Sequence, residues 1–231
     1  MRTRTTGPHS TFPRSLIITR NIPALRSPAT AIARLNLVRT AQRDARMPNS
    51  SRTRHIALLG LRGSGKSTVG RTLATRINLP FADTDDAVER RAGRSIAEIF
   101  AKDGEPAFRS LESDALAAFL NADRCVLSTG GGVVLDYDNR SMLRHRAVNI
   151  WLSAPLEQLA ARIAADSQSA ARRPALSDAP LIEELHAAEV VRRPYYSALA
   201  DLHLDTAALT PDDAARTIAE WLADTGLLES A

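Results

Sequence analysis

The sequence predicts an α/β fold with a five-stranded parallel sheet and helices on both of its faces. From about residue 54 onward, short apolar runs alternate with stretches of helical periodicity. A glycine-rich segment, GLRGSGKST at 60–68, joins the first apolar run to the first helical stretch. Parallel strands need crossover connections, usually helices, and are buried on both faces. The alternation therefore favours a parallel sheet between two helical layers.

The expected elements follow one another in a regular order. The strands are apolar runs bounded by turns, and they cover 55–60, 79–82, 124–128, 147–152 and 202–205. The helices cover 67–77, 85–91, 95–102, 107–121, 138–144, 156–165, 181–200 and 212–223. Two helix starts carry capping signals, because Glu98 follows Ser95 by three residues and two aspartates follow Pro211.

One long connection interrupts this rhythm. Residues 166–179 are polar, rich in Ser, Ala, Arg and Pro, and have no apolar period. A connection of that length in a compact domain is usually functional or disordered. In an enzyme that transfers phosphoryl groups, we expect it to form a mobile lid.

The segment 60–68 fits the phosphate-loop pattern G-x-x-x-x-G-K-[ST] between a strand and a helix. Its glycines let backbone N–H groups surround phosphate oxygens, and the helix N-terminus adds partial positive charge. Lys66, one of only two lysines in the chain, would reach the β- and γ-phosphates, and the Ser67 hydroxyl would bind Mg²⁺. The sequence thus predicts a nucleotide site that includes Gly63, Ser64, Gly65, Lys66, Ser67 and Thr68.

Two further groups of residues follow strands. Asp83 and Asp85 come after the second expected strand, and ligands bind at the carboxyl ends of strands in such sheets. One carboxylate could hold Mg²⁺ through water and the other could accept a proton, although an aspartate at a strand end is also a common helix cap. Gly130, Gly131 and Gly132 follow the third strand, either to let backbone approach a ligand or as a flexible turn.

Three arginines have suggestive surroundings. Arg109 lies early on an expected helix with Glu112 on the same face, Arg173 precedes a proline in the connection 166–179, and Arg192 lies near a helix end. Guanidinium groups donate bidentately to carboxylates and phosphates. Since most arginines in this chain must be solvated, this pattern alone leaves each of the three open.

Residues 1–50 form an arginine-rich extension that we expect to be disordered and separate from the domain at 51–231. They hold nine arginines and one acid, whereas the remainder has 21 basic and 25 acidic residues, a net charge of −4. Three interpretations are open: a reading-frame extension upstream of Met47, an organellar targeting segment, and a nucleic-acid-binding arm. The basic charge lies in the extension and therefore does not indicate nucleic-acid binding by the domain.

Other function classes find no support in the composition. The single cysteine, Cys125, excludes an internal disulfide framework and is expected in the core, which suits a reducing compartment. The histidines have no ligand spacing, so no metal cluster is expected. No apolar stretch approaches the ~20 residues that span a bilayer. We expect a cytoplasmic protein, or an organellar one if residues 1–50 are a targeting segment.

Taken together, these motifs resemble the shikimate kinase family of P-loop proteins over residues 54–222. Besides the phosphate loop, the resemblance rests on ordered motifs: Asp83-x-Asp85, Gly93 to Phe100, Gly104-Glu105 with Phe108-Arg109 and Glu112, Gly130 to Gly132, Arg173-Pro174, and Arg192-x-Pro194-x-Tyr196.

The resemblance implies a three-layer P-loop kinase, monomeric, with a lid near 166–179. It implies ATP- and Mg²⁺-dependent phosphorylation of the shikimate 3-hydroxyl, on the route to chorismate and the aromatic amino acids, with no nucleic-acid or membrane partner. For the nucleotide, the resemblance implies that Lys66 binds phosphate and takes part in catalysis, and that Arg162 and Pro211 lie near adenine. Mg²⁺ would be bound by Ser67 and, through water, by Asp83, and Arg173 would act in catalysis with the lid. For shikimate, Asp85 would contact the hydroxyls and act as the general base, Arg109 and Arg192 would bind the carboxylate, and Gly130 to Gly132 would contact the ring.

Several alternatives stay open from the sequence. The neighbouring pairs Arg172-Arg173 and Arg192-Arg193 leave their register uncertain by one residue, although the spacing to Pro194 and Tyr196 favours Arg192. A long lid leaves the alignment of Arg162 open. A gluconate kinase of the same branch would share the phosphate loop but is not expected to combine the arginine and glycine motifs. A non-catalytic module would be expected to lack Lys66, one of the aspartates or the lid arginine.

Overall fold

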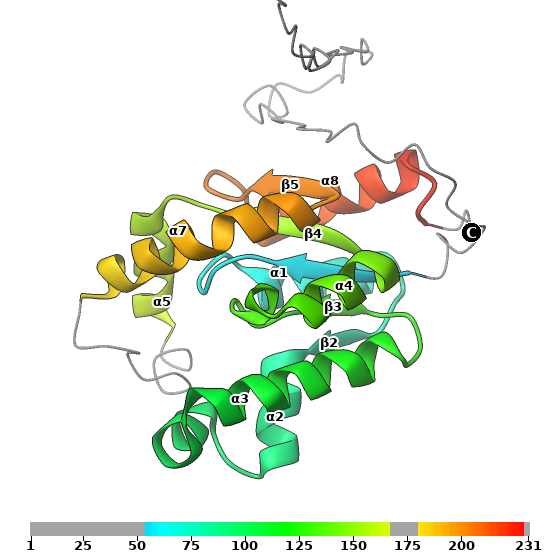
Figure 1. Ribbon diagram of the computed structural model, residues 1–231. Coiled ribbons are helices and arrows are strands. Elements are labelled where there is room, and N and C mark those ends of the chain that lie inside the picture. The colour runs from blue at the N-terminus through cyan, green and yellow to red at the C-terminus, as the bar shows by residue number, and fades with distance from the viewer. Residues whose placement is uncertain (1–53, 167–179, 229–231) are drawn as a thin grey trace, which may run out of the picture. The chain divides into compact units, whose positions relative to one another are not determined.

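The computed structural model describes residues 54–166 and 180–228, which contain a five-stranded parallel sheet (Figure 1). The strand order is β2-β3-β1-β4-β5, and every neighbouring pair is parallel. The strands are β1 (His55–Leu59), β2 (Phe81–Asp83), β3 (Val126–Ser128), β4 (Ala147–Ser153) and β5 (Leu202–Asp205). This confirms the predicted fold class. The predicted extension 1–50 and most of the predicted lid, with Arg172 and Arg173, lie outside the described residues.

Helices cover both faces of the sheet, as the alternating pattern predicted. They are α1 (Lys66–Arg76), α2 (Thr84–Ala92), α3 (Ile96–Leu120), α4 (Tyr137–Arg146), α5 (Leu156–Ala165), α7 (Leu181–Leu199) and α8 (Pro211–Asp224), with a short 3₁₀ turn η3 (Val133–Leu135). Alternate residues of a strand point to opposite faces. Ile56 and Leu58 of β1 accordingly pack with α1 and α8, whereas Ala57 and Leu59 pack with α3, α4, α5 and α7.

The ends of several elements follow from local chemistry. Ser95 and Glu98 form the predicted capping box at the start of α3, and Thr210 caps α8 with Pro211 in its first turn. Two helices were expected between 95 and 121, and α3 consists of two helical runs that meet at a kink. The kink lies at Gly104, whose φ of 78° and ψ of 174° are not helical. The predicted break is therefore a kink rather than a loop.

Several strand boundaries differ from those predicted: β3 begins at Val126 rather than at 124, and the second strand is displaced at both ends. We expected the second strand at 79–82, but β2 begins at Phe81 and includes Asp83. The backbone N–H of Leu79 donates to the carbonyl of Ala74, so this residue closes α1 instead of joining the sheet. Asp83 is thus the last residue of β2, and its side chain lies at the carboxyl edge.

Cys125 is buried, as predicted, directly before β3. Its sulfur lies 3.5 Å from Nδ1 of His55, and burial raises the pKa of the thiol to about 11. Such a thiol stays protonated at neutral pH and behaves as an apolar core group. In the described part of the chain, no helix is both long and apolar enough to cross a membrane.

Candidate active site

The phosphate loop occupies the turn between β1 and α1 and needs its glycines. Gly63 and Gly65 have φ of 80° and 89°, values that residues with a side chain rarely adopt. A Cβ at Gly63 would also lie 2.7 Å from the carbonyl oxygen of Leu159. The loop therefore packs against α5 through bare backbone.

A cleft of about 670 Å³ opens above this loop at the carboxyl edge of the sheet. Residues from well-separated parts of the sequence line it: the loop residues Gly63, Ser64, Gly65, Lys66, Ser67 and Thr68, the strand-end residues Asp83, Asp85, Ser128, Thr129 and Gly131, and Arg162, Thr206 and Pro211. The structure thus brings most of the predicted site residues to one cavity.

Lys66 is poised inside the loop. Its ammonium group donates to the carbonyl oxygen of Leu61 at 2.8 Å and lies 3.5 Å from Oγ of Ser64, and the residue is only 9% exposed. A positive charge held there faces the place where the loop amides converge. That arrangement suits the β- and γ-phosphates of a nucleotide.

Ser67 and Asp83 meet across the cleft floor. The Ser67 hydroxyl donates to Oδ2 of Asp83 at 2.7 Å and lies 3.2 Å from Oγ of Ser128. Oxygen ligands of this kind suit Mg²⁺, which is usually held by one or two protein groups together with water and phosphate. In the ranges 54–166 and 180–228, no group of three or more His, Cys, Asp and Glu side chains is placed to hold a metal by itself.

Asp83 serves two purposes at once. Its Oδ1 accepts a hydrogen bond of 2.9 Å from the backbone N–H of Asp85, which caps α2. Burial, followed by the charge of Asp85, raises the pKa of the Asp83 carboxyl above its usual range. A bound cation would reverse that effect, so the carboxylate is set up to gain from one.

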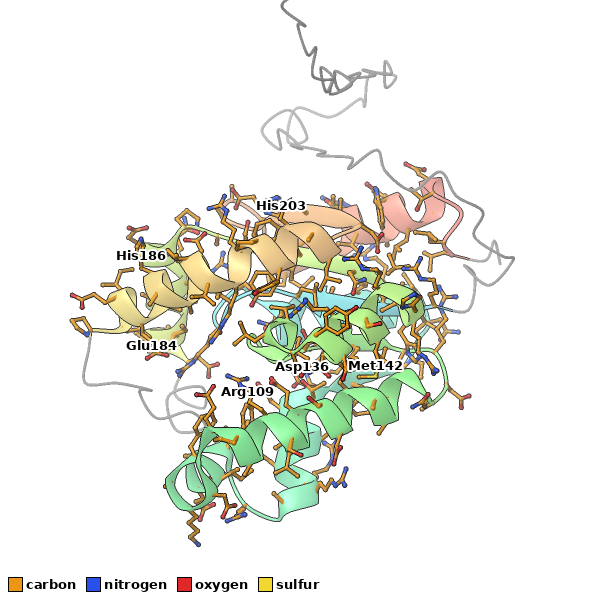
Figure 2. The ribbon with its side chains drawn as sticks, in the orientation of Figure 1. Arg109, Asp136, Met142, Glu184, His186 and His203 are labelled. Atoms are coloured by element: carbon orange, nitrogen blue, oxygen red, sulfur yellow. The ribbon has the colours of Figure 1, made fainter. Side chains whose placement is uncertain are left out.

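Arg109 projects from α3 (Figure 2) and pairs with two carboxylates. Its Nη1 lies 2.7 Å from Oε2 of Glu112, which is 1% exposed, and its Nη2 lies 2.8 Å from Oε1 of Glu105. Burial lowers the pKa of Arg109, but the two carboxylates outweigh it and raise the pKa above its usual value. The guanidinium is therefore held in one place and stays charged.

The three glycines make room for charged side chains. A Cβ at Gly130 would lie 1.9 Å from Oε1 of Glu112, and one at Gly132 would lie 2.2 Å from Nη1 of Arg109. The Gly130 backbone N–H donates to Oγ1 of Thr84 at 2.9 Å, which ties the turn to the start of α2. The glycines therefore allow close packing of the turn against Glu112 and Arg109, and the predicted approach of a ligand to their backbone stays a prediction.

Helix α7 reaches the same glycine turn. A Cβ at Gly131 would lie 3.5 Å from Nη1 of Arg192, whereas Arg193 is largely exposed and pairs with Glu189 at 3.1 Å. The structure therefore places Arg192, and not Arg193, beside the glycine turn that was predicted to contact the substrate. Four of the predicted substrate residues do not line the cleft itself: Arg109, Gly130, Gly132 and Arg192. They lie next to it, beside the lining residues Gly131 and Asp85.

Arg162 and Pro211, both predicted near adenine, also line the cleft. The Arg162 guanidinium donates to Oγ1 of Thr206 at 3.1 Å and to its carbonyl oxygen at 2.9 Å. These two bonds orient the guanidinium in a cleft whose lining also includes the apolar residues Leu209 and Ala214. A flat cation in such a position can stack on a purine ring.

Sequence reasoning missed Ser128, Thr129 and Thr206. All three lie at or just after the carboxyl ends of β3 and β5, so the strand-end rule that located Asp83 could have found them.

The comparisons with known proteins point in one direction. A family model described as shikimate kinase matches residues 62–223. A shikimate kinase of Cereibacter sphaeroides is 41% identical over 180 residues, which cover 78% of this chain and 88% of the relative. One of Symbiobacterium thermophilum is 42% identical over 172 residues, covering 74% and 98%.

Solved structures agree. The structure of a shikimate kinase from Acinetobacter baumannii in complex with shikimate superposes with a TM-score of 0.70 at 31% identity, covering 76% of this chain and 96% of that one. A shikimate kinase from Aquifex aeolicus superposes with a TM-score of 0.63 at 34% identity, covering 75% and 98%.

Proposed function

The chain belongs to the shikimate kinase family, and we propose that its cleft transfers the γ-phosphoryl group of ATP to the 3-hydroxyl of shikimate. One observation carries the assignment: a complete phosphate loop adjoins a second group of two guanidiniums, a carboxylate and bare glycine backbone. Shikimate has one carboxylate and several hydroxyls on a compact ring. Its chemistry therefore matches that second group.

The nucleotide lies along the first half of the cleft. The loop amides and Lys66 bind the β- and γ-phosphates, and the base lies between Arg162 and Pro211. Because Thr206 orients the Arg162 guanidinium, that side chain needs little rearrangement when the nucleotide arrives.

Mg²⁺ fits between the two halves. Ser67 would bind it directly and Asp83 through a water molecule, replacing the hydrogen bond that now joins them. When bound, the ion neutralises charge that develops on the transferred phosphoryl group.

Shikimate occupies the second half. Arg109 and Arg192 bind its carboxylate, Asp85 binds its ring hydroxyls, and Gly130 to Gly132 line the ring. Asp85 is held in the first turn of α2 by the hydrogen bond from its backbone N–H to Asp83, so its carboxylate can accept the proton of the attacking 3-hydroxyl. Phosphoryl transfer depends mainly on positioning and charge neutralisation, and these residues supply both. Arg173 would add positive charge to the transferring group, although it lies outside the described residues.

Further proposals concern the chain as a whole. From the resemblance to the family, we propose that the enzyme works as a monomer, in the cytoplasm, without help from residues 1–50. A protein that begins at Met47 is expected to keep the activity of the full chain, and size-exclusion chromatography with light scattering is expected to give the mass of one chain.

The assignment is tested by ADP release from the full chain with ATP and Mg²⁺, using shikimate, gluconate or buffer as the acceptor. Turnover that depends on shikimate alone supports the proposal. Turnover with gluconate would identify a different small-molecule kinase. ATP binding without turnover on either acceptor would favour a ligand-sensing module.

A further inference from the structure

We propose that Tyr196 is a positioning residue that fixes the glycine turn of the shikimate site relative to Arg192. The inference rests on the proposed function, since it concerns how the same site binds its acceptor. Tyr196 lies on α7, is 2% exposed, and donates its phenolic hydrogen to the carbonyl oxygen of Gly131. The two residues are 65 positions apart in the sequence.

The hydrogen bond completes the glycine turn. The carbonyls of Gly130 and Gly132 accept from the backbone N–H groups of Val133 and Leu135, at 3.1 and 3.0 Å. These two bonds hold the turn to η3. The Gly131 carbonyl accepts from the Tyr196 hydroxyl instead, which connects the middle of the turn to a different helix.

Tyr196 and Arg192 act on the same glycine from the same helix. They are four residues apart on α7 and therefore lie on one face of it. Arg192 approaches the Cα side of Gly131, at 3.5 Å from where a Cβ would stand, and Tyr196 holds its carbonyl. The hydroxyl thus sets the distance between the backbone of the turn and a guanidinium that we assign to the substrate carboxylate.

A stack of rings keeps the Tyr196 side chain in place. Its ring lies 5.9 Å from that of Trp151 on β4 at an angle of 26°, and the ring of Trp151 lies 3.9 Å from that of His203 on β5 at 14°. Nε2 of His203 is 2.8 Å from Oγ of Ser153. Trp151 pairs with Leu59 and His203 in the sheet, directly beneath the point where the phosphate loop begins. The tyrosine is therefore supported by the rigid sheet rather than by a loop.

The loss of this hydroxyl has a specific expected effect. Without it, the buried carbonyl of Gly131 loses its hydrogen bond, and the turn can shift relative to Arg192. A shift in the acceptor site weakens shikimate binding, whereas the nucleotide is held by the phosphate loop and Arg162. A purely structural tyrosine would change stability without this separation.

The test compares Tyr196→Phe with Tyr195→Phe in the full chain. Both variants lose one hydroxyl from adjacent positions of α7, but Tyr195 is 36% exposed and lies over Arg140. We expect Tyr196→Phe to raise the KM for shikimate about five- to twentyfold, as the loss of one buried hydrogen bond predicts, with the KM for ATP changed less than about twofold. Tyr195→Phe should leave both constants unchanged.

Two kinds of result would contradict the role of Tyr196. If folded Tyr196→Phe keeps the wild-type KM for shikimate, or if both KM values rise together, the positioning role is wrong. If the wild-type protein itself shows no turnover with shikimate, the proposed function fails and takes this inference with it.

A spectroscopic measurement covers the case in which Tyr196→Phe does not fold. In Trp221→Phe, Trp151 is the single tryptophan. Because the ring stack joins it to the glycine turn, shikimate without nucleotide is expected to change its emission. The matched Trp151→Phe protein, which keeps Trp221 on α8, should show no such change. An unchanged Trp151 emission at saturating shikimate would overturn the proposal.

Discussion

The substitution Gly132→Ala tests the shikimate site from its backbone side. A Cβ at this position would lie 2.2 Å from Nη1, 2.6 Å from Cζ and 2.7 Å from Nη2 of Arg109. Non-bonded carbon and nitrogen atoms need more than about 3 Å, so the guanidinium must move by roughly 1 Å. The backbone itself accepts alanine, since φ is −96° and ψ is −4°. The variant should therefore fold, with its main effect on Arg109.

The magnitude follows from what Arg109 is assigned to bind. A hydrogen bond to a charged group contributes about 1.5–3 kcal/mol, and each 1.4 kcal/mol corresponds to a factor of ten. Gly132→Ala is expected to raise the KM for shikimate about 10- to 100-fold. The KM for ATP should stay within about twofold because Arg109 is not a residue of the nucleotide half. The melting temperature should change little, since alanine also restricts the unfolded chain.

A double-mutant cycle tests whether alanine at position 132 acts through Arg109. Arg109→Ala should raise the KM for shikimate at least as much as Gly132→Ala does. If the alanine at 132 acts by displacing Arg109, the double variant should be no worse than Arg109→Ala alone. Steady-state kinetics at varied shikimate, with circular dichroism to confirm folding, provide the assay. A normal KM in Gly132→Ala, or effects that simply multiply in the double variant, would refute the assigned contact.

Three further expectations follow from the same geometry. Lys66→Ala should lower kcat at least about 100-fold in a protein that still folds, because its ammonium faces the ligand; turnover within tenfold of wild type would remove its assigned role. Asp83→Asn should raise the Mg²⁺ concentration for half-maximal activity about tenfold or more. The Asp83→Asn substitution should not lower the melting temperature of the metal-free protein at pH 7.5. Because the pKa of Asp83 is raised in the folded state, this carboxyl stabilises the fold only at low pH, and its contribution is lost as pH rises through the folded pKa. Burial lowers the pKa of His203 in the folded state. The neutral imidazole therefore contributes fully to the free energy of unfolding above 6.5, the pKa of the unfolded state, and this contribution is lost as pH falls through the folded pKa. Urea unfolding between pH 7.5 and 5 should accordingly show a smaller loss of stability in His203→Gln than in wild type, and equal losses would contradict the shift.

Local patterns predicted much of this molecule because they depend on local physics. The five strands follow from apolar runs, and the helix starts at Ser95 and Pro211 follow from capping chemistry. The meeting of Ser67 with Asp83 was also predictable in outline, since a loop after β1 and the end of β2 share one edge of the sheet.

The remaining features depend on packing between distant segments. Nothing local to Tyr196 indicates that its hydroxyl holds Gly131, because the contact requires α7 to lie across the glycine turn. The motif spacing favoured Arg192 over Arg193, but the place of Arg192 beside Gly131 depends on how α7 is rotated against the turn. The start of the predicted second strand was wrong for a local reason instead, since the backbone N–H of Leu79 donates to Ala74 and closes α1.

The most direct test of the central claim is to identify the product. The full chain is incubated with ATP, Mg²⁺ and shikimate, and the product is examined by phosphorus and proton NMR. The account predicts a new phosphate ester coupled to the proton at carbon 3 of the ring, with one ADP formed for each ester and neither product in Lys66→Ala. An ester at another hydroxyl would contradict the placement of Asp85, and ADP formation without any ester would contradict the assignment of the second half of the cleft to shikimate.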